Sequence, residues 1–491
     1  MRLADLLAAA GMDAAAAGDA AVTGFAIDHR KVAPGTIFGA FEGATVNGED
    51  FIHPAIDAGA IAVVARPEAR VEGALHIADV APRRAFARLA AGFFSPYPAT
   101  LVAVTGTNGK TSCVEMTRQI WRMTGERAAS IGTLGVTTPD GSVSTGLTTP
   151  DIVTFLGNMA GLAREGVTHV AYEASSHGLD QYRNEGLTVS ASAFTNFSRD
   201  HLDYHGTMEA YFAAKMRLFT EVVAPGSPAV IHDAGDGSEW TAKAIAQAKA
   251  RGLTVLTVGE GGDFLRLAAR EPGQLGQMLT IEHAGETRKV NLPLIGAYQA
   301  ANALVSAGLA LATGVGASAV FDALTRLQPV RGRLERAALN QAGAPAYVDY
   351  AHTPDALEAA IAALRPHVAG SGRLIVVFGA GGDRDAGKRP QMGEVAARAA
   401  DLAIVTDDNP RSEDPAEIRA AIMAGAGASA REIEGRRAAI AAAVGEAGPR
   451  DIVLIAGKGH EQGQIFGSGE TMRIEAFDDV EVARECAGGQ C

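Results

Sequence analysis

The sequence has few cysteines, and it has neither a long apolar run nor a long basic one. The three cysteines, Cys113, Cys486 and Cys491, lack the spacing of a disulfide framework, which indicates a reducing compartment. No stretch approaches the roughly 18 consecutive apolar residues of a membrane-spanning helix, so we expect no membrane insertion. The first residues, MRLADLLAAAGMDAAAA, are interrupted by Asp5 and Asp13 and predict a helix instead of a signal peptide. We therefore expect a cytoplasmic protein.

The charge of the chain bears on its partners. A net charge of -13 without a basic run argues against nucleic acid as the main partner, because phosphate neutralisation needs a basic face. Local groups can still bind small anionic ligands against the overall field. We therefore look for small-molecule ligands.

The length and composition indicate a globular protein of several domains. Hydrophobic residues make up 47% of the chain and charged residues 20%, which excludes general disorder. At roughly 150 residues per domain, 491 residues predict about three domains. Two Pro-containing seams, FFSPYPAT at 93–100 and LQPVRGRLE at 327–335, divide the chain. The predicted domains are residues 1–96, 97–330 and 331–491.

The second and third parts alternate apolar strands with helices. LVAVTG and THVAYEASSHG are strand patterns of the second part, and RLIVVFGAGG and DIVLIAGKG are strand patterns of the third. Continuous apolar strands separated by helices predict parallel sheets that are covered on both faces, an α/β fold. Nearly every strand ends in a polar cluster, and ligands of such sheets bind beyond the carboxyl ends of the strands. We therefore expect these clusters to share a cleft.

The stretch LVAVTGTNGKTS, residues 101–112, is a candidate phosphate loop. The strict pattern G-x-x-x-x-G-K-[ST] fails, because Val104 stands where a glycine is required. Nevertheless, a buried strand runs into a helix here, and the turn between them directs backbone N–H groups at a site where anions bind. Lys110 supplies a positive charge, and Thr111 offers a hydroxyl to Mg²⁺. On these residues alone, an ordinary strand–helix turn is an almost equal alternative.

Acidic and imidazole side chains follow the loop in the sequence. Glu173 ends a strand, and His201 lies in the cluster RDHLDYH. With the loop and Lys215, such groups can surround two hard cations and a triphosphate. Each has a simpler interpretation, because a strand-end carboxylate is commonly a solvated cap and Lys215 alone would be read as an exposed helix lysine. Together, in this order, they favour metal binding.

The ordered set of motifs resembles one known family. TGTNGKTS, EASSHGLDQYR, FTNFSRDHLDYHGTMEAYFAAKMRLF, RGRLE, VDYAHTPDALE, GAGGDRDAGKRP, TDDNPRSEDP and AGKGHEQGQ are similar to motifs of the Mur ligases. Within that family, the chain is similar to the branch that adds meso-diaminopimelate to UDP-N-acetylmuramoyl-L-alanyl-D-glutamate. The motifs span residues 105–464, and the N-terminal part resembles the family more loosely.

The resemblance implies a fold and an activity. The expected domains are a small N-terminal α/β uridine-binding domain, a central P-loop-type parallel-sheet ATPase domain and a C-terminal Rossmann-like domain. The expected reaction is ATP-driven amide formation in peptidoglycan precursor synthesis, through an acyl phosphate. The implied substrates are ATP, the UDP-muramoyl-dipeptide and meso-diaminopimelate, and the enzyme is expected to act as a monomer.

The resemblance also assigns roles to residues. The implied catalytic residues are Lys110, His201 and Lys215, the last carbamylated. The implied ATP contacts are Gly106, Thr107, Asn108, Gly109, Lys110, Thr111, Asn302, Arg333, Asp349 and His352. The implied ligands for Mg²⁺, expected as two ions, are Thr111, Glu173, His201 and the carbamate of Lys215. The implied contacts to the UDP-muramoyl-dipeptide are His29, Thr148, Thr149, Ser175, Gln181 and Arg183, and those to diaminopimelate are Arg384, Asp408, Asn409, Arg411, Gly457 and Glu461.

The chain departs from the family pattern at two places, and other functions stay open as alternatives. His29 stands where relatives commonly have serine, and Gln299 stands where they often have asparagine. A folylpolyglutamate synthetase shares the ATP chemistry but would lack DNPR and a uridine-binding domain. The lysine-adding Mur ligases differ mainly at DNPR, and a nucleotide-binding scaffold without activity could lose Glu173, Lys215 or Arg411, all of which are present.

Overall fold

The computed structural model describes residues 1–15, 17–43, 46–143 and 148–489. The chain forms two compact units, one of Met1–Asp263 with Val305–Gly316 and one of Phe264–Leu304 with Ala317–Cys491. The predicted bounds of the three domains stay predictions, and Cys491 lies outside the described residues.

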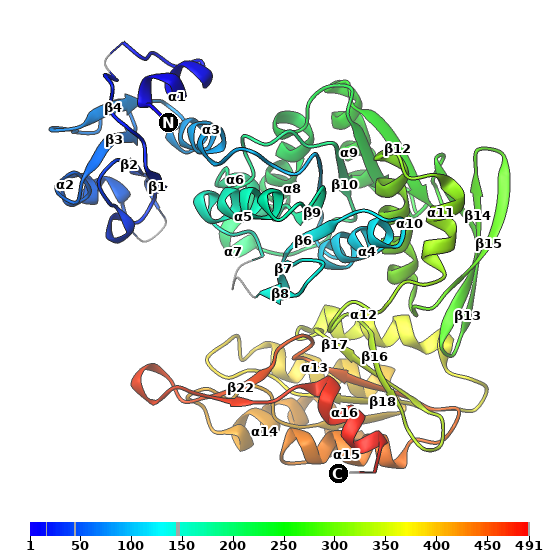
Figure 1. Ribbon diagram of the computed structural model, residues 1–491. Coiled ribbons are helices and arrows are strands. Elements are labelled where there is room, and N and C mark those ends of the chain that lie inside the picture. Colours follow the sequence, from blue (N-terminus) through cyan, green and yellow to red (C-terminus); the bar gives the residue numbers. More distant parts are fainter. Residues whose placement is uncertain (16, 44–45, 144–147, 490–491) are drawn as a thin grey trace. The chain divides into compact units, whose positions relative to one another are not determined.

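The first unit begins with a small parallel sheet (Figure 1). Its four strands lie in chain order: β1 (Gly24–Ala26), β2 (Thr36–Gly39), β3 (Ala60–Ala65) and β4 (Leu75–Ala78). The helices of this part are α1 (Leu3–Ala9), α2 (Ile52–Asp57) and α3 (Pro82–Phe94). Alternate strand residues enter different cores, since Ile37 packs in the cluster that includes Phe86 of α3, and Phe38 packs in the cluster that includes Ile52 of α2. The sheet is therefore covered on both faces.

A second sheet of the first unit carries the candidate phosphate loop. Its strands lie in the order β12-β11-β10-β5-β9-β6-β7-β8, and those from β12 to β6 are parallel. Their bounds are β5 Thr100–Thr105, β6 Ala128–Gly132, β7 Gly135–Thr137, β8 Ser142–Val143, β9 His169–Glu173, β10 Ala191–Phe194, β11 Pro228–His232 and β12 Thr254–Gly259. The helices are α4 Lys110–Met123, α5 Ile152–Arg164, α6 Ser176–Asp180, α7 Leu202–His205, α8 Met208–Arg217 and α9 Glu239–Ala250. Leu101–Val104 are buried throughout, as the apolar run predicts for a central parallel strand.

The second unit contains a six-stranded sheet in the order β16-β17-β21-β18-β19-β20. The strands are β16 Glu335–Leu339, β17 Pro345–Asp349, β18 Leu374–Phe378, β19 Leu402–Val405, β20 Ala430–Glu432 and β21 Ile452–Ala456. All neighbours are parallel except β16 and β17. The helices are α12 Pro354–Leu364, α13 Lys388–Ala399, α14 Pro415–Ala426, α15 Arg436–Glu446 and α16 Asp479–Ala487, and a short ribbon joins β22 Gly463–Phe466 to β23 Arg473–Ala476.

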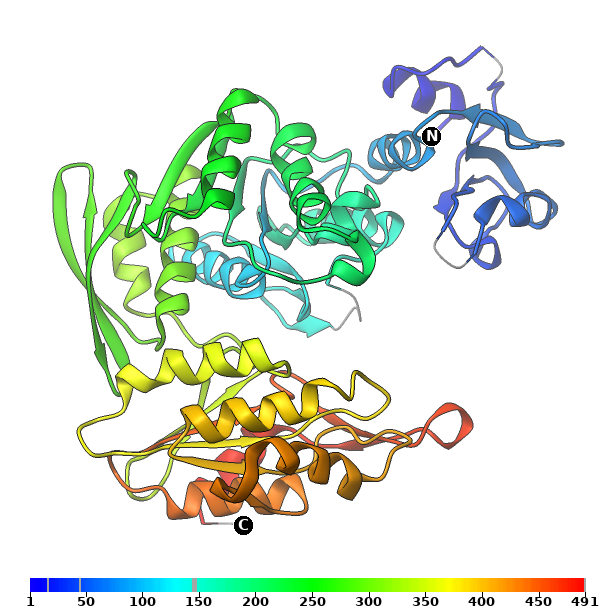
Figure 2. The same ribbon diagram turned by 180° about the vertical axis from the view of Figure 1, so that it is seen from behind.

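Helices cover both faces of this sheet. Val376 packs in one core with residues of α12, α13 and α14, and its neighbour Val377 packs in another core with residues of α15 and α16. Seen from behind, the yellow-to-orange helices α12, α13 and α14 lie in front of the strands (Figure 2). The continuous apolar strand LIVVF is explained by this two-sided burial. The predicted α/β class with parallel sheets is confirmed.

An antiparallel hairpin belongs to the second unit together with the six-stranded sheet. Its two strands are β13 (Leu265–Gly273) and β14 (Gly276–His283), and β15 (Glu286–Leu292) pairs with β14 as a third antiparallel strand. The helices α10 (Ala297–Ala312) and α11 (Ala317–Leu324) follow. At the hairpin tip, Gln274 donates to Pro449 O at 3.0 Å and accepts at its backbone oxygen from Tyr347 Oη at 3.2 Å. The ring of His367 joins Gly273 O and Gly296 N, at 2.6 and 2.9 Å. The hairpin tip is therefore hydrogen-bonded to β17 of the six-stranded sheet and to segments beside that sheet.

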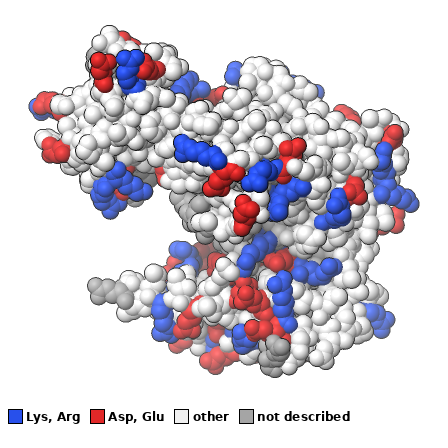
Figure 3. All heavy atoms as spheres, in the orientation of Figure 1, with Lys and Arg blue, Asp and Glu red and all other residues white. Residues whose placement is uncertain are grey.

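Charged side chains of both signs are interspersed on the face of the molecule seen in Figure 3. Among the described residues, no helix is long and apolar enough to cross a membrane.

Candidate active site

The phosphate loop connects β5 to α4, as the sequence predicts. Gly106 has φ +143°, and a Cβ at this position would lie 1.9 Å from Thr195 Oγ1, so the loop requires glycine there. Gly109 has φ +84° and directly precedes α4. The backbone N–H groups at the start of α4 have no helical partners and favour anions. The geometry is that of an anion-binding loop, although the strict pattern fails.

Two residues that follow β10 form hydrogen bonds to the backbone of the phosphate loop. Thr195 Oγ1 donates to Asn108 O at 2.6 Å. The side chain of Asn196 accepts from Asn108 N at 2.9 Å and donates to Asn108 O at 3.1 Å. Sequence reasoning gave no role to the threonine and asparagine of FTNFSRDH, because only their position in space reveals it.

Two lysines converge on one carbonyl of the loop. Lys110 Nζ donates to Gly106 O at 3.0 Å and to Thr107 O at 2.9 Å, and Lys215 Nζ donates to Gly106 O at 2.7 Å. Lys215 is only 1% exposed and lies over the ring of Tyr211, so the interpretation as an exposed helix lysine is wrong. Burial lowers the pKa of Lys215 well below its usual value, and the charge of Lys110 lowers it further. The site favours a neutral amine at Lys215.

Glu173 lies at the end of β9, in register with Val104 just before the loop. It is buried, and its carboxylate accepts from Thr133 N at 2.7 Å. Thr133 Oγ1 lies 3.3 Å from the same carboxylate and 3.1 Å from Thr148 Oγ1, which connects the acidic group to a predicted substrate contact. Sequence reasoning missed Thr133, because it lies in a turn without a charged neighbour.

His201 precedes α7 in a left-handed conformation, with φ 49°. Its side chain is 45% exposed and stands 3.5 Å from Asp200, with the His177 ring centroid 4.9 Å away. Burial lowers the pKa of His201, and the charge of Lys110 adds to this effect, while the neighbouring carboxylate of Asp200 opposes it. The imidazole is therefore favoured in its neutral, ligating form.

The donors near the loop fit a magnesium ion in part. No group of three His, Cys, Asp or Glu side chains within the described ranges is placed to hold a metal alone. The hydroxyl of Thr111, at the start of α4, and the carboxylate of Glu173, beside β5, are oxygen donors of the kind Mg²⁺ prefers. The His201 imidazole is a less usual ligand for this ion. The oxygen donors fit Mg²⁺ bound with a nucleotide, which would supply further oxygens.

The predicted dipeptide contacts of this unit form a connected group. Thr149 Oγ1 donates to Ser175 Oγ at 2.9 Å. Arg183 donates to Thr149 O at 2.9 Å and to Gln181 Oε1 at 2.6 Å. His29 lies in the N-terminal part, where its ring stacks on Phe51 with centroids 4.5 Å apart.

In the second unit, Gln299 connects two predicted nucleotide contacts. It is buried and accepts from Asn302 Nδ2 at 3.1 Å, while its own amide donates to Arg333 O at 2.7 Å. The departure from asparagine therefore places a longer amide that reaches both residues. Its side chain thereby holds Asn302 and the backbone of Arg333 together.

The other nucleotide contacts adjoin this group. The Arg333 guanidinium lies over the Tyr350 ring, 4.9 Å from its centroid. Asp349 accepts from Leu334 N at 2.8 Å and from Ala351 N at 3.0 Å, and burial raises the pKa of its carboxyl. His352 is exposed, with Nδ1 2.8 Å from Tyr350 O. The structure thus brings Arg333, Asp349 and His352 to one edge of the sheet, around Tyr350.

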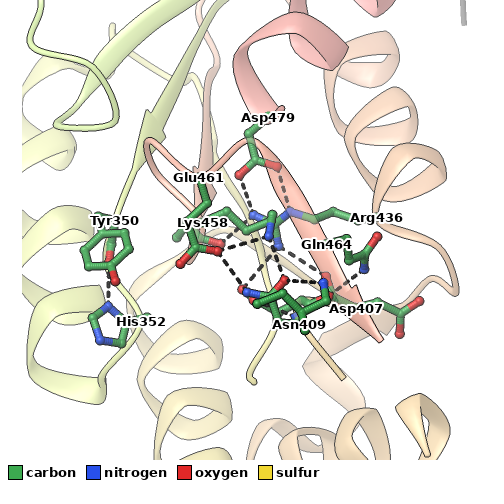
Figure 4. Close-up of polar contacts among 12 residues, drawn as sticks. Tyr350, His352, Asp407, Asn409, Arg436, Lys458, Glu461, Gln464 and Asp479 are labelled. Atoms are coloured by element: carbon green, nitrogen blue, oxygen red, sulfur yellow. Dashed lines mark hydrogen bonds and ion pairs between the residues drawn. The ribbon is translucent and has the colours of Figure 1, made fainter. Parts of the chain in front are cut away.

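The predicted amino-acid contacts follow β18, β19 and β21 in the chain. Figure 4 shows two of them, Asn409 and Glu461, beside each other. Asn409 donates to Glu461 Oε2 at 2.8 Å, and a Cβ on Gly457 would lie 2.6 Å from Asp408 Oδ2. Arg411 has φ 53°, and its Nη1 donates to Gly382 O at 2.8 Å. Arg384 is exposed in the loop that follows β18. These groups form a cluster of opposite charges that suits an amino acid with several charged ends.

The cluster rests on buried ionic groups that sequence reasoning did not select. Arg436 is fully buried and pairs with Asp479 at 2.7 Å. It also donates to Asp407 O at 3.2 Å and to Ala456 O at 2.9 Å (Figure 4). Arg436 begins α15, far from the motifs in sequence, so only the fold brings it to the cluster.

Acidification should weaken the second unit through His460. This residue packs on the Tyr350 ring, and burial with nearby Arg333 and Arg331 lowers the pKa of His460 to about 4. An unfolded histidine binds its proton near pH 6.5, so stability is present above that pH and is lost as pH falls from about 6.5 to about 4. We expect the thermal midpoint of wild type to fall more in this window than that of His460→Gln. An equal decrease in both proteins would contradict this expectation.

Three family models match successive parts of the chain. The Mur ligase family catalytic domain matches residues 21–93, the Mur ligase middle domain residues 104–310, and the Mur ligase glutamate ligase domain residues 332–459. A protein of Zymomonas mobilis named UDP-N-acetylmuramoyl-L-alanyl-D-glutamate–2,6-diaminopimelate ligase is 60% identical over 95% of both chains. The chain belongs to the Mur ligase family. A Bradyrhizobium diazoefficiens protein of the same name is 54% identical over 95% of this Mur ligase and 96% of its own length.

Solved structures agree with the family. A structure of a UDP-N-acetylmuramoyl-L-alanyl-D-glutamate–2,6-diaminopimelate ligase has 33% identity to this Mur ligase and a TM-score of 0.73, and it covers 96% of this chain and 95% of its own. A Mycobacterium tuberculosis folylpolyglutamate synthase has a TM-score of 0.60 over 77% of this chain and 92% of its own, but only 20% identity, so the likeness is one of fold alone. The predicted family and the three-domain α/β organisation are confirmed.

Proposed function

We propose that this Mur ligase joins meso-diaminopimelate to the D-glutamate of UDP-N-acetylmuramoyl-L-alanyl-D-glutamate, at the expense of ATP. The observation that carries the proposal is the 60% identity, over nearly the whole of both chains, to a ligase named for this reaction. The expected setting is the cytoplasm, and the expected active form is a monomer that acts on three small molecules.

The chemistry requires activation of a carboxylate. A carboxylate oxygen of the D-glutamate attacks the γ-phosphorus of ATP, and ADP leaves, which yields an acyl phosphate. The amino nitrogen of the second substrate then attacks the acyl carbon, phosphate leaves, and the amine loses a proton. Positioning and neutralisation of charge account for most of the catalysis in such phosphoryl transfers.

The residues of the first unit suit the phosphoryl transfer. Lys110 and the loop N–H groups would hold the transferred phosphoryl group. Mg²⁺, which Thr111 and Glu173 would hold, supplies positive charge to the phosphate oxygens when bound. Arg183 offers a fork of N–H donors that fits a carboxylate of the dipeptide.

Lys215 is proposed to carry a carbamate. Its neutral amine would add to the carbon of CO₂ and release one proton, which leaves an anionic oxygen ligand on the side chain. The lowered pKa supports this step, because only the unprotonated amine reacts. An ammonium would repel a bound cation, whereas a carbamate with His201 would attract a second Mg²⁺.

Lys215→Ala should inactivate the enzyme and be partly restored by a short carboxylic acid. Alanine removes the anionic oxygens and leaves a buried gap, which acetate or propionate can enter. We expect turnover to fall by about a hundredfold or more, as when one charge-stabilising group is removed. Carbon-13 NMR of wild type under labelled CO₂ should show a carbamate signal, and the signal should be absent from the variant. An unmodified amine in the ATP-bound wild type would refute the carbamate.

The decisive test of the function is ATP-dependent phosphate release. Purified enzyme is given UDP-muramoyl-dipeptide and, separately, diaminopimelate, lysine and glutamate. Release that depends on both the dipeptide and diaminopimelate supports the proposal. Equal use of lysine would place the chain in the lysine-adding branch. In a separate assay with a folate in place of the UDP-dipeptide, phosphate release that depends on glutamate would favour the folylpolyglutamate synthetase alternative.

A further inference from the structure

A fully buried lysine lies beneath the amino-acid cluster, outside the residues assigned to it so far. Lys458 lies two residues after the end of β21 and has a side chain that is 0% exposed. Its Nζ donates to Asn409 Oδ1 at 2.9 Å, to Glu461 Oε2 at 3.2 Å and to Gly463 O at 2.6 Å (Figure 4). An ammonium has three N–H donors, so these acceptors use all of them.

The contacts of Lys458 determine the orientation of the Asn409 amide. Asn409 Oδ1 accepts from Lys458 Nζ and also from Ile465 N, at 3.0 Å. Both groups can only donate, so the amide oxygen must face them and the flipped orientation is excluded. The two lone pairs of Oδ1 are thereby used. Asn409 can therefore present only N–H groups to a ligand.

The carboxylate of Glu461 is oriented by the same contacts. Its Oε2 accepts from Asn409 Nδ2 at 2.8 Å and from Lys458 Nζ at 3.2 Å. In the part of the chain that the structure describes, Oε1 has no hydrogen-bond donor, and Nδ2 of Asn409 has no second acceptor. Glu461 thus offers a free acceptor beside the free donor of Asn409.

We propose that Lys458 is a positioning residue for amino-acid recognition, because its buried ammonium directs an Asn409 N–H to a ligand carboxylate and Glu461 Oε1 to the neighbouring ligand ammonium. The ligand class is a zwitterionic α-amino carboxylate, and Arg411 adds its fork on the carboxylate side. The proposal rests on the function proposed above. It adds which side of the site faces the ligand carboxylate, which side faces the ligand ammonium, and that Lys458 sets this orientation, here called the polarity of the site.

The test is steady-state kinetics of Lys458→Met, a substitution of similar length without the charge. Each substrate is varied in turn. Hydrogen bonds to charged groups contribute enough for a change of about ten- to a hundredfold. We expect the KM for diaminopimelate to rise by that factor, with the KM values for ATP and the UDP-dipeptide within about twofold of wild type. The matched control is Lys289→Met, the same change at an exposed position on β15.

A merely structural role would give a different result. If Lys458 only fastens the β21–β22 segment, kcat and the thermal midpoint should fall, and the KM values for all three substrates should change together. That result would overturn the proposal. An unchanged KM for the amino acid would also overturn it. If Lys458→Met does not fold, Asn409→Asp decides, because it keeps an acceptor for Lys458 but replaces the N–H donors with oxygen. An amino-acid KM equal to that of wild type in this variant would refute the assigned polarity.

Wild type separates failure of this proposal from failure of the proposed function. If wild type uses lysine instead of diaminopimelate, the assigned substrate is wrong, but the comparison is then made with lysine, whose far-end ammonium still needs Glu461 Oε1. An unchanged KM for lysine in Lys458→Met would overturn the positioning role. If wild type adds no amino acid at all, both proposals are refuted.

Discussion

Lys110→Ala should nearly abolish turnover while the protein stays folded. The ammonium of Lys110 lies over the phosphate loop, on Gly106 O and Thr107 O, where it would neutralise charge on the transferred phosphoryl group. Removing one preorganised charge-stabilising group costs about 10²- to 10³-fold in kcat. The measurement is ATP-dependent phosphate release at saturating substrates, alongside the thermal midpoint.

Lys249→Ala is the matched control for this change. Lys249 is exposed on α9, in the same unit as the loop, and should keep the activity of wild type. If Lys110→Ala turns over at a rate near that of wild type, the loop does not take part in catalysis, and the assignment of its residues fails.

Arg411→Ala should remove the preference for diaminopimelate over lysine. The two amino acids differ by one carboxylate, and Arg411 is held with its guanidinium at the amino-acid cluster by Gly382 O and by backbone bonds to Ile465 and Gly467. A site built to bind a charged hydrogen-bonding group can reject a ligand without it by about 10⁴-fold. We expect wild type to show a preference of this order in kcat/KM. The variant should lose it by failing on diaminopimelate.

Two further variants sharpen this experiment. Arg411→Lys keeps the charge without the planar fork and should recover only part of the preference. Arg473→Ala removes an exposed arginine of β23, whose ion pair is with Glu475, and should behave as wild type. Equal kcat/KM of wild type for diaminopimelate and lysine would refute the role given to Arg411.

The sequence predicted the strands and their polar ends, but not every environment around them. Apolar runs such as LIVVF predicted buried parallel strands, because burial on both faces leaves no polar alternation. Lys215 was harder, since a lysine on a helix is ordinarily exposed. Its burial follows from the packing of α8 against the phosphate loop, where Gly106 O accepts from Nζ. Tyr211, four residues earlier on the same helix face, covers the side chain, and this spacing was the available signal.

The residues that support the candidate site could not be predicted from the sequence. Asn409 and Glu461 could be selected from motifs, whereas Lys458 reads as one more charge in a Gly-rich loop. Its role depends on Gly463 O and Asn409 Oδ1 lying within reach of the same ammonium, which a linear pattern does not encode. Arg436 likewise gains its role from Asp479, which lies 43 residues away.

The hairpin of the second unit affects how relatives of this enzyme can be recombined. Its tip is bonded to Tyr347, His367 and Pro449, and residues 264–304 share a compact unit with the C-terminal sheet. A chimaera that exchanges only residues after the seam at 330 would pair a foreign sheet with the native hairpin. The partners of those hydrogen bonds would then come from two different proteins. Transplanting the hairpin together with the sheet keeps co-adapted partners together, so substrate specificity should transfer between family members more readily as this larger, discontinuous cassette.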